Sequence, residues 1–328
     1  MRTEREAAGA PSPGRPVGDR EADVARYAVL DIGSNSVKLY AARVVHGRVT
    51  PLADRLVVTR LAAGLDEDGD LTGAAMARTV DAVTALRREA EALGVEKVVA
   101  VGTEALRRAG NAGELLDLLR RRARLRVRVL EADQEAALAW EAARRSLPDA
   151  PNALAVFDAG GASTELVDGR DGRPVAWGSV PLGVRSLAER HRLEGRADDA
   201  RLAAALATAR DAVAALPRVA AGRLAGIGGT PHTLASLRRG ERPADPWSLN
   251  GEVLARDDVQ ALADRLRGLS LTERRRLPGL LPERADVALA GAVLVLALLD
   301  HAGLDAFTVS AAGLRHAVFH REFLARGR

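Results

Sequence analysis

The chain of 328 residues contains no cysteine, which excludes disulfides and thiolate metal sites. It also lacks any apolar run near the roughly 20 residues that a membrane-spanning helix requires. These two absences favour a soluble protein of the cytoplasm. Aromatic residues make up only 3% of the chain, so the stacking platforms that bind single-stranded nucleic acid are scarce.

An excess of charge of one sign is also missing, because 48 basic residues nearly balance 44 acidic ones and the formal net charge is +4. Nearly all basic residues are arginine, since lysine occurs only as Lys38 and Lys97. A net charge this small favours an acidic partner only weakly. We therefore expect no specific binding to nucleic acid and no membrane partner.

Apolar residues, by contrast, are plentiful. They make up 47% of the sequence, enough for one large core or two ordinary ones. The first 23 residues differ, since they are rich in Arg, Glu, Gly and Pro and have no apolar segment of the kind found in secretory signals. We expect residues 1–23 to be a disordered extension outside the fold.

Two loops of the sequence look like copies of each other. "LDIGSNSVKL" occupies residues 30–39 and "FDAGGASTEL" residues 157–166, and both place an aspartate after an apolar strand and before glycine and serine. Each is surrounded by the pattern strand, loop, strand, turn, strand. Alternating helices and strands follow each unit, which indicates parallel strands with helical crossovers.

The periodicity after the first unit predicts helices over 72–93, 104–122 and 133–146, with strands at 97–102 and 127–130. After the second unit it predicts helices near 183–191 and 197–215, a strand at 223–229, a helix from 231, a helical run to about 300 and a strand at 306–310. The spacing of 127 residues between Asp31 and Asp158 fits two domains of similar topology that face each other. The gap between them is the expected ligand site.

The composition of the two loops predicts a phosphate and magnesium site. Glycine lets an anion approach a row of backbone N–H groups, and hydroxyl side chains add donors. A carboxylate there would repel phosphate unless a cation lay between them, and Mg²⁺ takes oxygen ligands. We therefore assign Asp31, Asp158 and Glu165 to Mg²⁺. The expected phosphate-binding residues are Gly33, Ser34, Asn35, Ser36, Gly160, Gly161, Ala162, Ser163 and Thr164.

A third glycine cluster, "GIGGTPHTL", adds Gly228, Gly229 and Thr230, because the first turn of a helix favours anions. Alone, this cluster fits a plain helix cap equally well. Each of the two loops alone likewise fits an ordinary hairpin with an Asx turn. The two matching copies favour the phosphate site.

Together with "GTEALRRAGN", "VLEADQEAALAW", "SVPLGVRSL", "ERADVALAGAVLVL" and "TVSAAGLRHAVF", these motifs resemble the exopolyphosphatase and guanosine pentaphosphate phosphatase family over roughly residues 26–320. The resemblance implies an α/β fold of two actin-like domains (ASKHA, ribonuclease H-like) with a cleft between them. Residues 24–147 are then domain I and 148–310 domain II. Residues 311–328 are expected to form a helix that packs back on domain I.

The resemblance also implies a Mg²⁺-dependent phosphohydrolase that removes the terminal phosphate from inorganic polyphosphate, guanosine pentaphosphate or both. It implies Glu135 as the base that activates water, and Arg107 as a cation that faces the substrate phosphates. Shorter family members lack an additional C-terminal domain, which implies short polyphosphate chains. Dimers occur in the family, so a homodimer is one expected assembly.

Two other functions stay open. A polyphosphate or guanosine pentaphosphate binding module with weak catalysis is favoured by Ala162 and Gln134, which replace a glycine and a frequent acid of the family, while Ala311 replaces another common acid. An ATPase or sugar kinase of the same superfamily is favoured by the paired loops. Without the resemblance, Glu135 would be a first-turn acid after an Asp133 N-cap, and an arginine such as Arg107 would be a surface charge.

A few further polar residues have no decided role. Asn111 and Lys38 lie beside the motifs, and each fits a structural role as well as a functional one. Arg108, the surface-exposed neighbour of Arg107, is the alternative candidate for the arginine that faces the phosphates. His316 and His320 share a helix face at i and i+4 but lack a third zinc ligand, so we expect surface positions for them.

Overall fold

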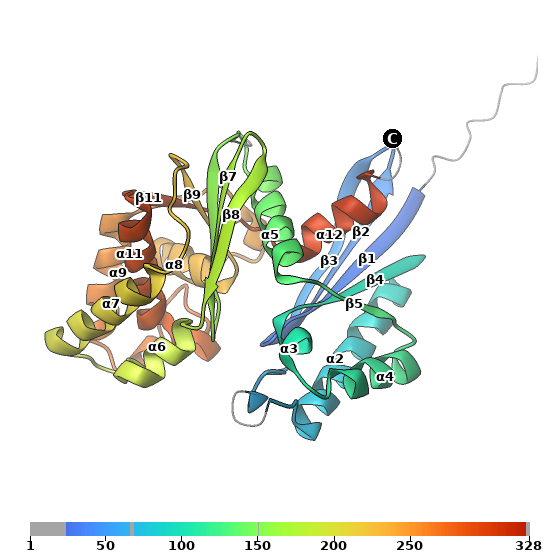
Figure 1. The fold of residues 1–328 in the computed structure, drawn as a ribbon, viewed down its shortest axis with the longest axis horizontal. Coiled ribbons are helices and arrows are strands. Elements are labelled where there is room, and N and C mark those ends of the chain that lie inside the picture. Colours follow the sequence, from blue (N-terminus) through green and yellow to red (C-terminus); the bar gives the residue numbers. More distant parts are fainter. Residues whose placement is uncertain (1–23, 66–68, 150, 326–328) are drawn as a thin grey trace, which may run out of the picture.

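The computed structural model describes residues 24–65, 69–149 and 151–325, which form two α/β halves (Figure 1). The extension expected at residues 1–23 lies outside the described residues. One sheet has five strands in the order β3-β2-β1-β4-β5, and the other has six in the order β10-β11-β9-β6-β7-β8. The expected two-domain α/β architecture is confirmed.

Each half begins with the same three-stranded antiparallel unit. The first comprises β1 (Val24–Ile32), β2 (Ser36–Val45) and β3 (Arg48–Val58), and the second β6 (Leu154–Ala159), β7 (Thr164–Arg170) and β8 (Arg173–Val180). The register aligns the two copies, since Asp31 lies opposite Lys38 and Asp158 lies opposite Glu165. The middle of each sheet is completed by a parallel neighbour, β4 (Lys97–Gly102) beside β1 and β9 (Leu224–Ile227) beside β6.

In the first half, the outer face of the sheet is covered by α2 (Gly73–Ala92) and α4 (Ala112–Arg122), and β5 (Val127–Val129) forms an edge. The single helix predicted over 104–122 is wrong, because the short α3 (Glu104–Arg108) ends at the extended Ala109. The Asn111 side chain then accepts from the Leu71 N–H at 2.8 Å and donates to the Leu71 carbonyl at 3.0 Å. A contact distant in sequence therefore sets the start of α4, and Asn111 has this structural role.

In the second half, helices cover the outer face of the six-stranded sheet. They are α6 (Val184–His191), α7 (Asp199–Val213), α8 (Gly229–Arg239), α9 (Arg256–Arg267), α10 (Leu271–Arg274) and α11 (Ala288–Ala302), with the 3-10 turns η1 (Pro246–Leu249) and η2 (Pro282–Arg284). The strands β10 (Val253–Ala255) and β11 (Ala306–Val309) complete the sheet. The predicted helical run to about 300 is thus several helices, and β10 was missed because three residues carry no readable alternation.

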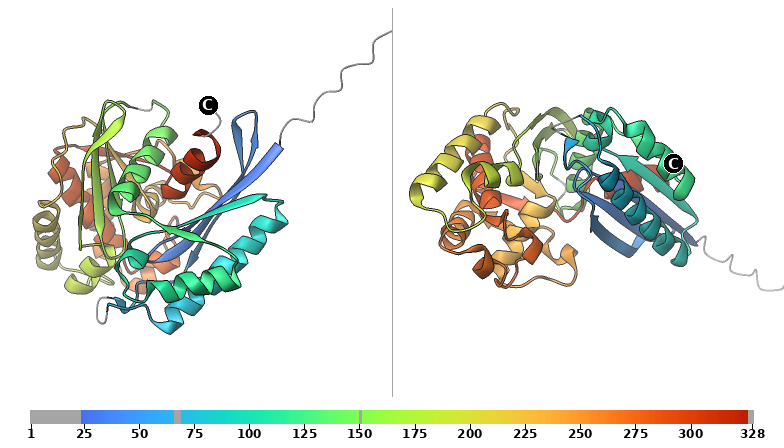
Figure 2. Two further views of the ribbon diagram at one scale, coloured as in Figure 1. Left: turned by 45° about the vertical axis from the view of Figure 1, so that its right-hand side comes forward. Right: turned by 90° about the horizontal axis from the view of Figure 1, so that it is seen from below.

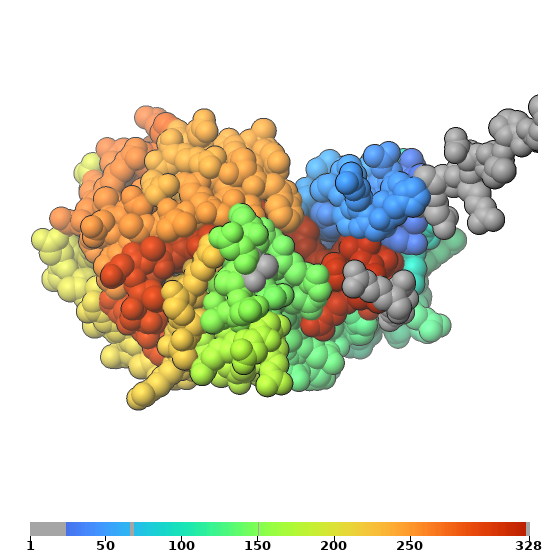
Figure 3. All heavy atoms as spheres, turned by 90° about the horizontal axis from the view of Figure 1, so that it is seen from above, coloured from blue at the N-terminus to red at the C-terminus, as the bar shows by residue number. Residues whose placement is uncertain are grey.

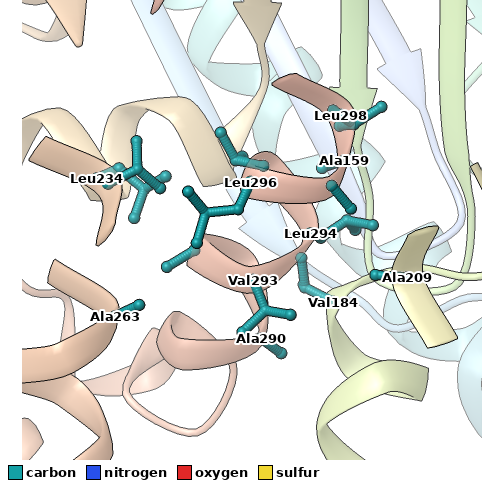
Figure 4. Close-up of a cluster of buried hydrophobic side chains, with 14 of the residues drawn as sticks. Ala159, Val184, Ala209, Leu234, Ala263, Ala290, Val293, Leu294, Leu296 and Leu298 are labelled. Atoms are coloured by element: carbon teal, nitrogen blue, oxygen red, sulfur yellow. The ribbon is translucent and has the colours of Figure 1, made fainter. Parts of the chain in front are cut away.

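Helix α11 lies at the centre of this helical layer, which explains why nearly all of it is apolar. Figure 4 shows its side chains between Val184, Ala209, Leu234 and Ala263 of the surrounding helices. Such a helix, hydrophobic on every side, is stable only inside a core or a bilayer. Within the described part of the chain, no helix combines the length and hydrophobicity that crossing a membrane requires.

Two helices lie between the halves, as Figure 2 shows: α5 (Ala132–Ser146) and α12 (Leu314–Phe323). Trp140 of α5 packs over Gly169 of β7 and donates from Nε1 to the Leu154 carbonyl at 2.7 Å. On the other side of α5, Leu138 joins the cluster that holds α12 against the first sheet. Figure 3 shows the C-terminal helix in red between the blue N-terminal strands and the green region of α5.

Aromatic rings attach α12 to β1 and β2. Tyr27 stacks on Phe323 at 4.3 Å, and Tyr40 meets Phe319 edge to face at 5.1 Å. These contacts use much of the small aromatic content of the chain. The C-terminal segment is therefore part of the first half's core, although it follows the second half in sequence.

The predicted surface position of His316 is wrong. Its side chain is 9% exposed and lies between the rings of Tyr40 and Trp247, at 4.5 and 5.3 Å. Burial lowers the pKa of His316 to about 4, so the ring is neutral at pH 7. Beside it, Asp54 of β3 accepts two hydrogen bonds from Arg315, at 3.0 and 2.9 Å. His320 is partly exposed and contacts Arg145.

Phe319→Ala is expected to destabilise the fold by about 3–5 kcal/mol, because it leaves a cavity where α12 meets Tyr40. Urea unfolding followed by circular dichroism measures the change. Phe319→Leu keeps most of the buried volume and serves as the control. Equal stability of Phe319→Ala and wild type would show that α12 contributes little to the first core.

Candidate active site

The two copied loops have the same backbone turn. In the first, the Gly33 N–H donates to the Ser36 carbonyl at 3.0 Å, and in the second the Gly160 N–H donates to the Ser163 carbonyl at 2.9 Å. A Cβ at Gly33 would lie 3.3 Å from the Ser36 carbonyl oxygen, and a Cβ at Gly160 would lie 3.1 Å from that of Ser163. Both distances are shorter than most Cβ contacts. The closeness of the turn therefore favours glycine in both copies.

The loops converge across the gap between the halves. Lys38 Nζ lies 3.7 Å from Asp31 Oδ2 in the first half. Burial raises the pKa of Asp158 in the second half, and so does the negative charge of Asp31, whereas Lys38 lowers it. Charges from the two loops thus act on one another, which places Asp31 and Asp158 at one site.

Glu165 adds a third carboxylate to this site. Burial, with the negative charges of Asp158 and Glu135, raises its pKa to about 8, although Ser179 Oγ donates to its carboxylate at 2.9 Å. Carboxylates held together in this way remain ionised only if a cation neutralises them. The arrangement fits a divalent cation.

Among the described residues, no three acidic or histidine side chains meet as a complete metal centre. Mg²⁺ does not need such a centre, because it commonly keeps several waters and binds one or two carboxylates together with substrate phosphates. Asp31, Asp158 and Glu165 fit this mode of binding, and their assignment to Mg²⁺ stays a prediction.

Glu135 lies in the first turn of α5, where the helix that joins both halves begins. Arg107 of α3 donates to Glu135 Oε2 at 3.0 Å and to the Leu130 carbonyl at 2.7 Å. Burial raises the pKa of Glu135 to about 6, while Arg107 opposes the shift and the charge of Asp31 adds to it. The base proposed from the sequence is therefore within electrostatic reach of the loop carboxylates.

The start of α5 differs from the expected one. Glu131, and not Asp133, is the N-cap residue. Gln134 closes the capping box by accepting from the Glu131 N–H at 3.2 Å. Gln134 thus serves the helix start, as a glutamate at this position also would.

The third glycine cluster lies against the second loop. Gly228 has φ +81°, and a Cβ there would lie 2.6 Å from Asp158 Oδ1. A Cβ at Gly229 would collide with the guanidinium of Arg284. The glycines therefore allow both an aspartate and an arginine to approach the start of α8.

Sequence reasoning missed Arg284 as a site residue. It lies in the quoted "ERADVALAGAVLVL" segment, and that motif was the only signal for it. Burial lowers the pKa of Arg284, while Asp158 and Asp286 raise it. Lys38, Arg107 and Arg284 are thus three cations among four carboxylates of the site.

Two predicted phosphate donors have other partners. The Thr164 hydroxyl donates to the Leu182 carbonyl at 2.6 Å, and the Thr230 hydroxyl donates to the Ala159 carbonyl at 2.8 Å. Both side chains are buried, so they hold α6 and α8 against the sheet and do not face the gap. Tertiary contacts therefore use both hydroxyls, and the assignment of Thr164 and Thr230 to phosphate binding stays a prediction. The loop tips remain exposed or partly exposed at Gly33, Ser34, Asn35, Gly160, Gly161, Ala162 and Ser163.

Ser36, by contrast, is buried at the start of β2. Arg108 is exposed and bonds to Glu104 at 3.3 Å, as expected of a surface charge.

Comparison with known proteins identifies the family of this chain. The profile of the Ppx/GppA phosphatase family matches residues 40–325. The chain belongs to this family. An Aquifex aeolicus Ppx/GppA family structure has 30% sequence identity and a TM-score of 0.80, over 93% of this chain and 99% of that one. The actin-like fold predicted from the motifs is confirmed by this likeness.

Relatives in the Ppx/GppA family carry both expected activities in their names. A guanosine-5′-triphosphate,3′-diphosphate pyrophosphatase of Aeromonas salmonicida is 27% identical over 301 residues, which are 90% of this chain but 58% of the relative. Exopolyphosphatase 1 of Mycobacterium leprae is 27% identical over 306 residues, 90% of this chain and 89% of the relative. The chain thus spans little more than half the length of the first of these proteins.

Gly183→Ala is expected to weaken substrate binding about tenfold or more. A Cβ at 183 would lie 2.5 Å from the Gly160 carbonyl oxygen and 2.5 Å from the Ala162 nitrogen, so the second loop must shift. The Val184 N–H, which donates to Gly160 at 2.8 Å, would move with it. KM for tripolyphosphate measures the effect, with Gly195→Ala as the control because nothing lies within 4 Å of its Cβ position. An unchanged KM would mean that the loop tolerates the shift.

Proposed function

We propose that this member of the Ppx/GppA family is a Mg²⁺-dependent exopolyphosphatase that releases terminal orthophosphate from inorganic polyphosphate. The observation that carries the proposal is the convergence of the two loops with Glu135, held by Arg107 at 3.0 Å. Polyphosphate is favoured as the substrate because the Mycobacterium leprae exopolyphosphatase matches over nearly its whole length. Short chains are the expected substrates, and the cytoplasm is the expected compartment.

Glu135 supplies the base in this proposal. A water held between its carboxylate and the terminal phosphorus loses a proton to Glu135 as the new P–O bond forms. The bond to the next phosphate breaks, and that phosphate leaves as an anion. Arg107 fixes the carboxylate by its hydrogen bond and has further N–H groups for phosphate oxygens.

The loops bind and orient the polyanion. The Gly33 and Gly160 N–H groups close the two tight turns, and the exposed loop tips present their other backbone N–H groups to the polyanion. Lys38 and Arg284 add positive charge. Bound Mg²⁺ supplies the charge neutralisation that the departing phosphate needs. No covalent intermediate is required, because water is the nucleophile.

Guanosine pentaphosphate is the second candidate substrate, favoured by the name of the Aeromonas salmonicida relative. Its 5′ end is a triphosphate, so the same loops and the same base can act on it. The two substrates differ in the nucleoside, which polyphosphate lacks. A third candidate, a regulator that binds either polyanion without turnover, rests on Ala162 at the tip of the second loop.

Glu135→Gln is expected to reduce kcat by about 100-fold or more, because the amide cannot accept the proton of water. Phosphate release from tripolyphosphate in the presence of Mg²⁺ compares the variant with wild type and tests the base. The same assay on wild type with a chelator in place of Mg²⁺ tests the need for the metal. Glu131→Gln is the matched control, since Glu131 is the N-cap of the same helix. Equal rates for Glu135→Gln and wild type remove Glu135 from this role, and tight binding with no turnover by wild type supports the regulator.

The rate is expected to fall as the pH drops below about 6. Glu135 acts as a base only when ionised, and its pKa raised to about 6 means that most of it is protonated at pH 5. Each pH unit below the pKa then costs up to about tenfold in kcat/KM. A profile of kcat/KM from pH 5 to 8 measures the decline. A flat profile over this range contradicts Glu135 as the ionising base.

A further inference from the structure

Three consecutive apolar residues are exposed where β3 ends. Leu56 and Val58 are each 53% exposed, and Val57 is 36% exposed. β3 is an edge strand, and its end is tied to the first loop, because the Thr59 and Arg60 N–H groups both donate to the Asn35 carbonyl at 3.0 Å. An exposed apolar group next to a binding loop is a common mark of ligand contact.

The pairing of β3 with β2 decides which way these side chains point. Leu56 lies opposite Lys38, and Val58 lies opposite Ser36. Paired residues of antiparallel strands share a face, with Cβ atoms about 5 Å apart. Leu56 and Val58 therefore stand on the face that carries Lys38, whose Nζ lies 3.7 Å from Asp31. Val57 lies opposite Val37 on the other face, toward α2.

The same face continues toward the second half. Asp54, two residues before Leu56, lies opposite Tyr40 and binds Arg315. His232, in the first turn of α8, donates from Nδ1 to the Gly228 carbonyl at 2.7 Å. Burial lowers the pKa of His232, the charge of Arg284 lowers it further, and the charge of Asp54 raises it. Leu56 thus stands at the edge of the gap that α8 and Arg284 border from the other side.

An apolar wall contributes nothing to the binding of inorganic polyphosphate, every part of which is charged and hydrated. It does favour a flat, apolar group attached to a polyphosphate, because burying that group removes apolar surface from water. A purine base is such a group.

We propose that Leu56 and Val58 form the seat for the purine ring of a nucleoside 5′-polyphosphate, namely guanosine pentaphosphate. The inference rests on the proposed phosphohydrolase function and names what selects its second substrate. With the terminal phosphate at the two loops, the polyphosphate passes Lys38 and the base reaches the end of β3. Contact with Leu56 and Val58 favours binding of the purine ring and leaves the binding of polyphosphate chains unchanged.

The test measures KM and kcat of three variants with Mg²⁺, for guanosine pentaphosphate and for tripolyphosphate. Leu56→Ala is expected to raise KM for guanosine pentaphosphate about three- to tenfold and to leave KM for tripolyphosphate unchanged. Leu56→Trp is expected to lower KM for guanosine pentaphosphate only, because an indole stacks on a base. Val57→Ala, the exposed neighbour on the opposite face, is expected to change neither.

Other outcomes overturn the seat. If Leu56→Ala changes KM for both substrates equally, Leu56 is a contact that the halves make when they close. If it changes KM for neither substrate, Leu56 does not contact the substrate. Calorimetric binding of both compounds to the same variants repeats the test without turnover. A wild type that hydrolyses neither compound refutes the phosphohydrolase, while the binding of guanosine pentaphosphate still decides the seat.

Discussion

The burial of neighbouring carboxylates in one gap, together with their mutual repulsion, is the constraint on which the site depends. Asp31, Asp158, Glu135 and Glu165 come from both halves. Burial raises the pKa of the last three; the charge of Asp31 raises that of Asp158 and Glu135 further, and the charges of Asp158 and Glu135 add to the shift of Glu165. Lys38, Arg107 and Arg284 offset part of this charge, but a polyanion brings more. This balance favours a cation beside the substrate, and it is the physical basis of the dependence on Mg²⁺ that we propose.

Helix α5 links this constraint to the fold. Its first turn carries Glu135, its middle fills the second half through Trp140, and its other side joins the core of the first half through Leu138. The base is therefore positioned by a rigid element that contacts both sheets, and a shift of one half against the other moves Glu135 relative to a loop. The C-terminal helix α12 packs beside α5 and strengthens the same junction.

The duplication also shows how one structural unit acquired two roles. Asp31 and Asp158 occupy equivalent positions, but their cross-strand partners are Lys38 in the first copy and Glu165 in the second. The same place in the pleat thus carries a cation suited to phosphate in one half and an anion suited to a metal in the other. The next strand differs as well, with exposed Leu56 opposite Lys38 and Ser179 opposite Glu165. The two copies therefore present different charges to the gap between the halves.

The sequence alone determined the duplicated strand units, the class of fold and most of the loop residues, because strand alternation and glycine turns are local properties. It also pointed to Glu135 and Arg107, but only through a resemblance to known motifs. The tertiary structure alone decided that the hydroxyls of Thr164 and Thr230 donate to internal carbonyls, that His316 is buried, that the predicted helix is interrupted between Arg108 and Ala112, and that Arg284 reaches the site. Each of these depends on a partner distant in the chain, since a side chain's hydrogen bonds and burial are set by what packs against it.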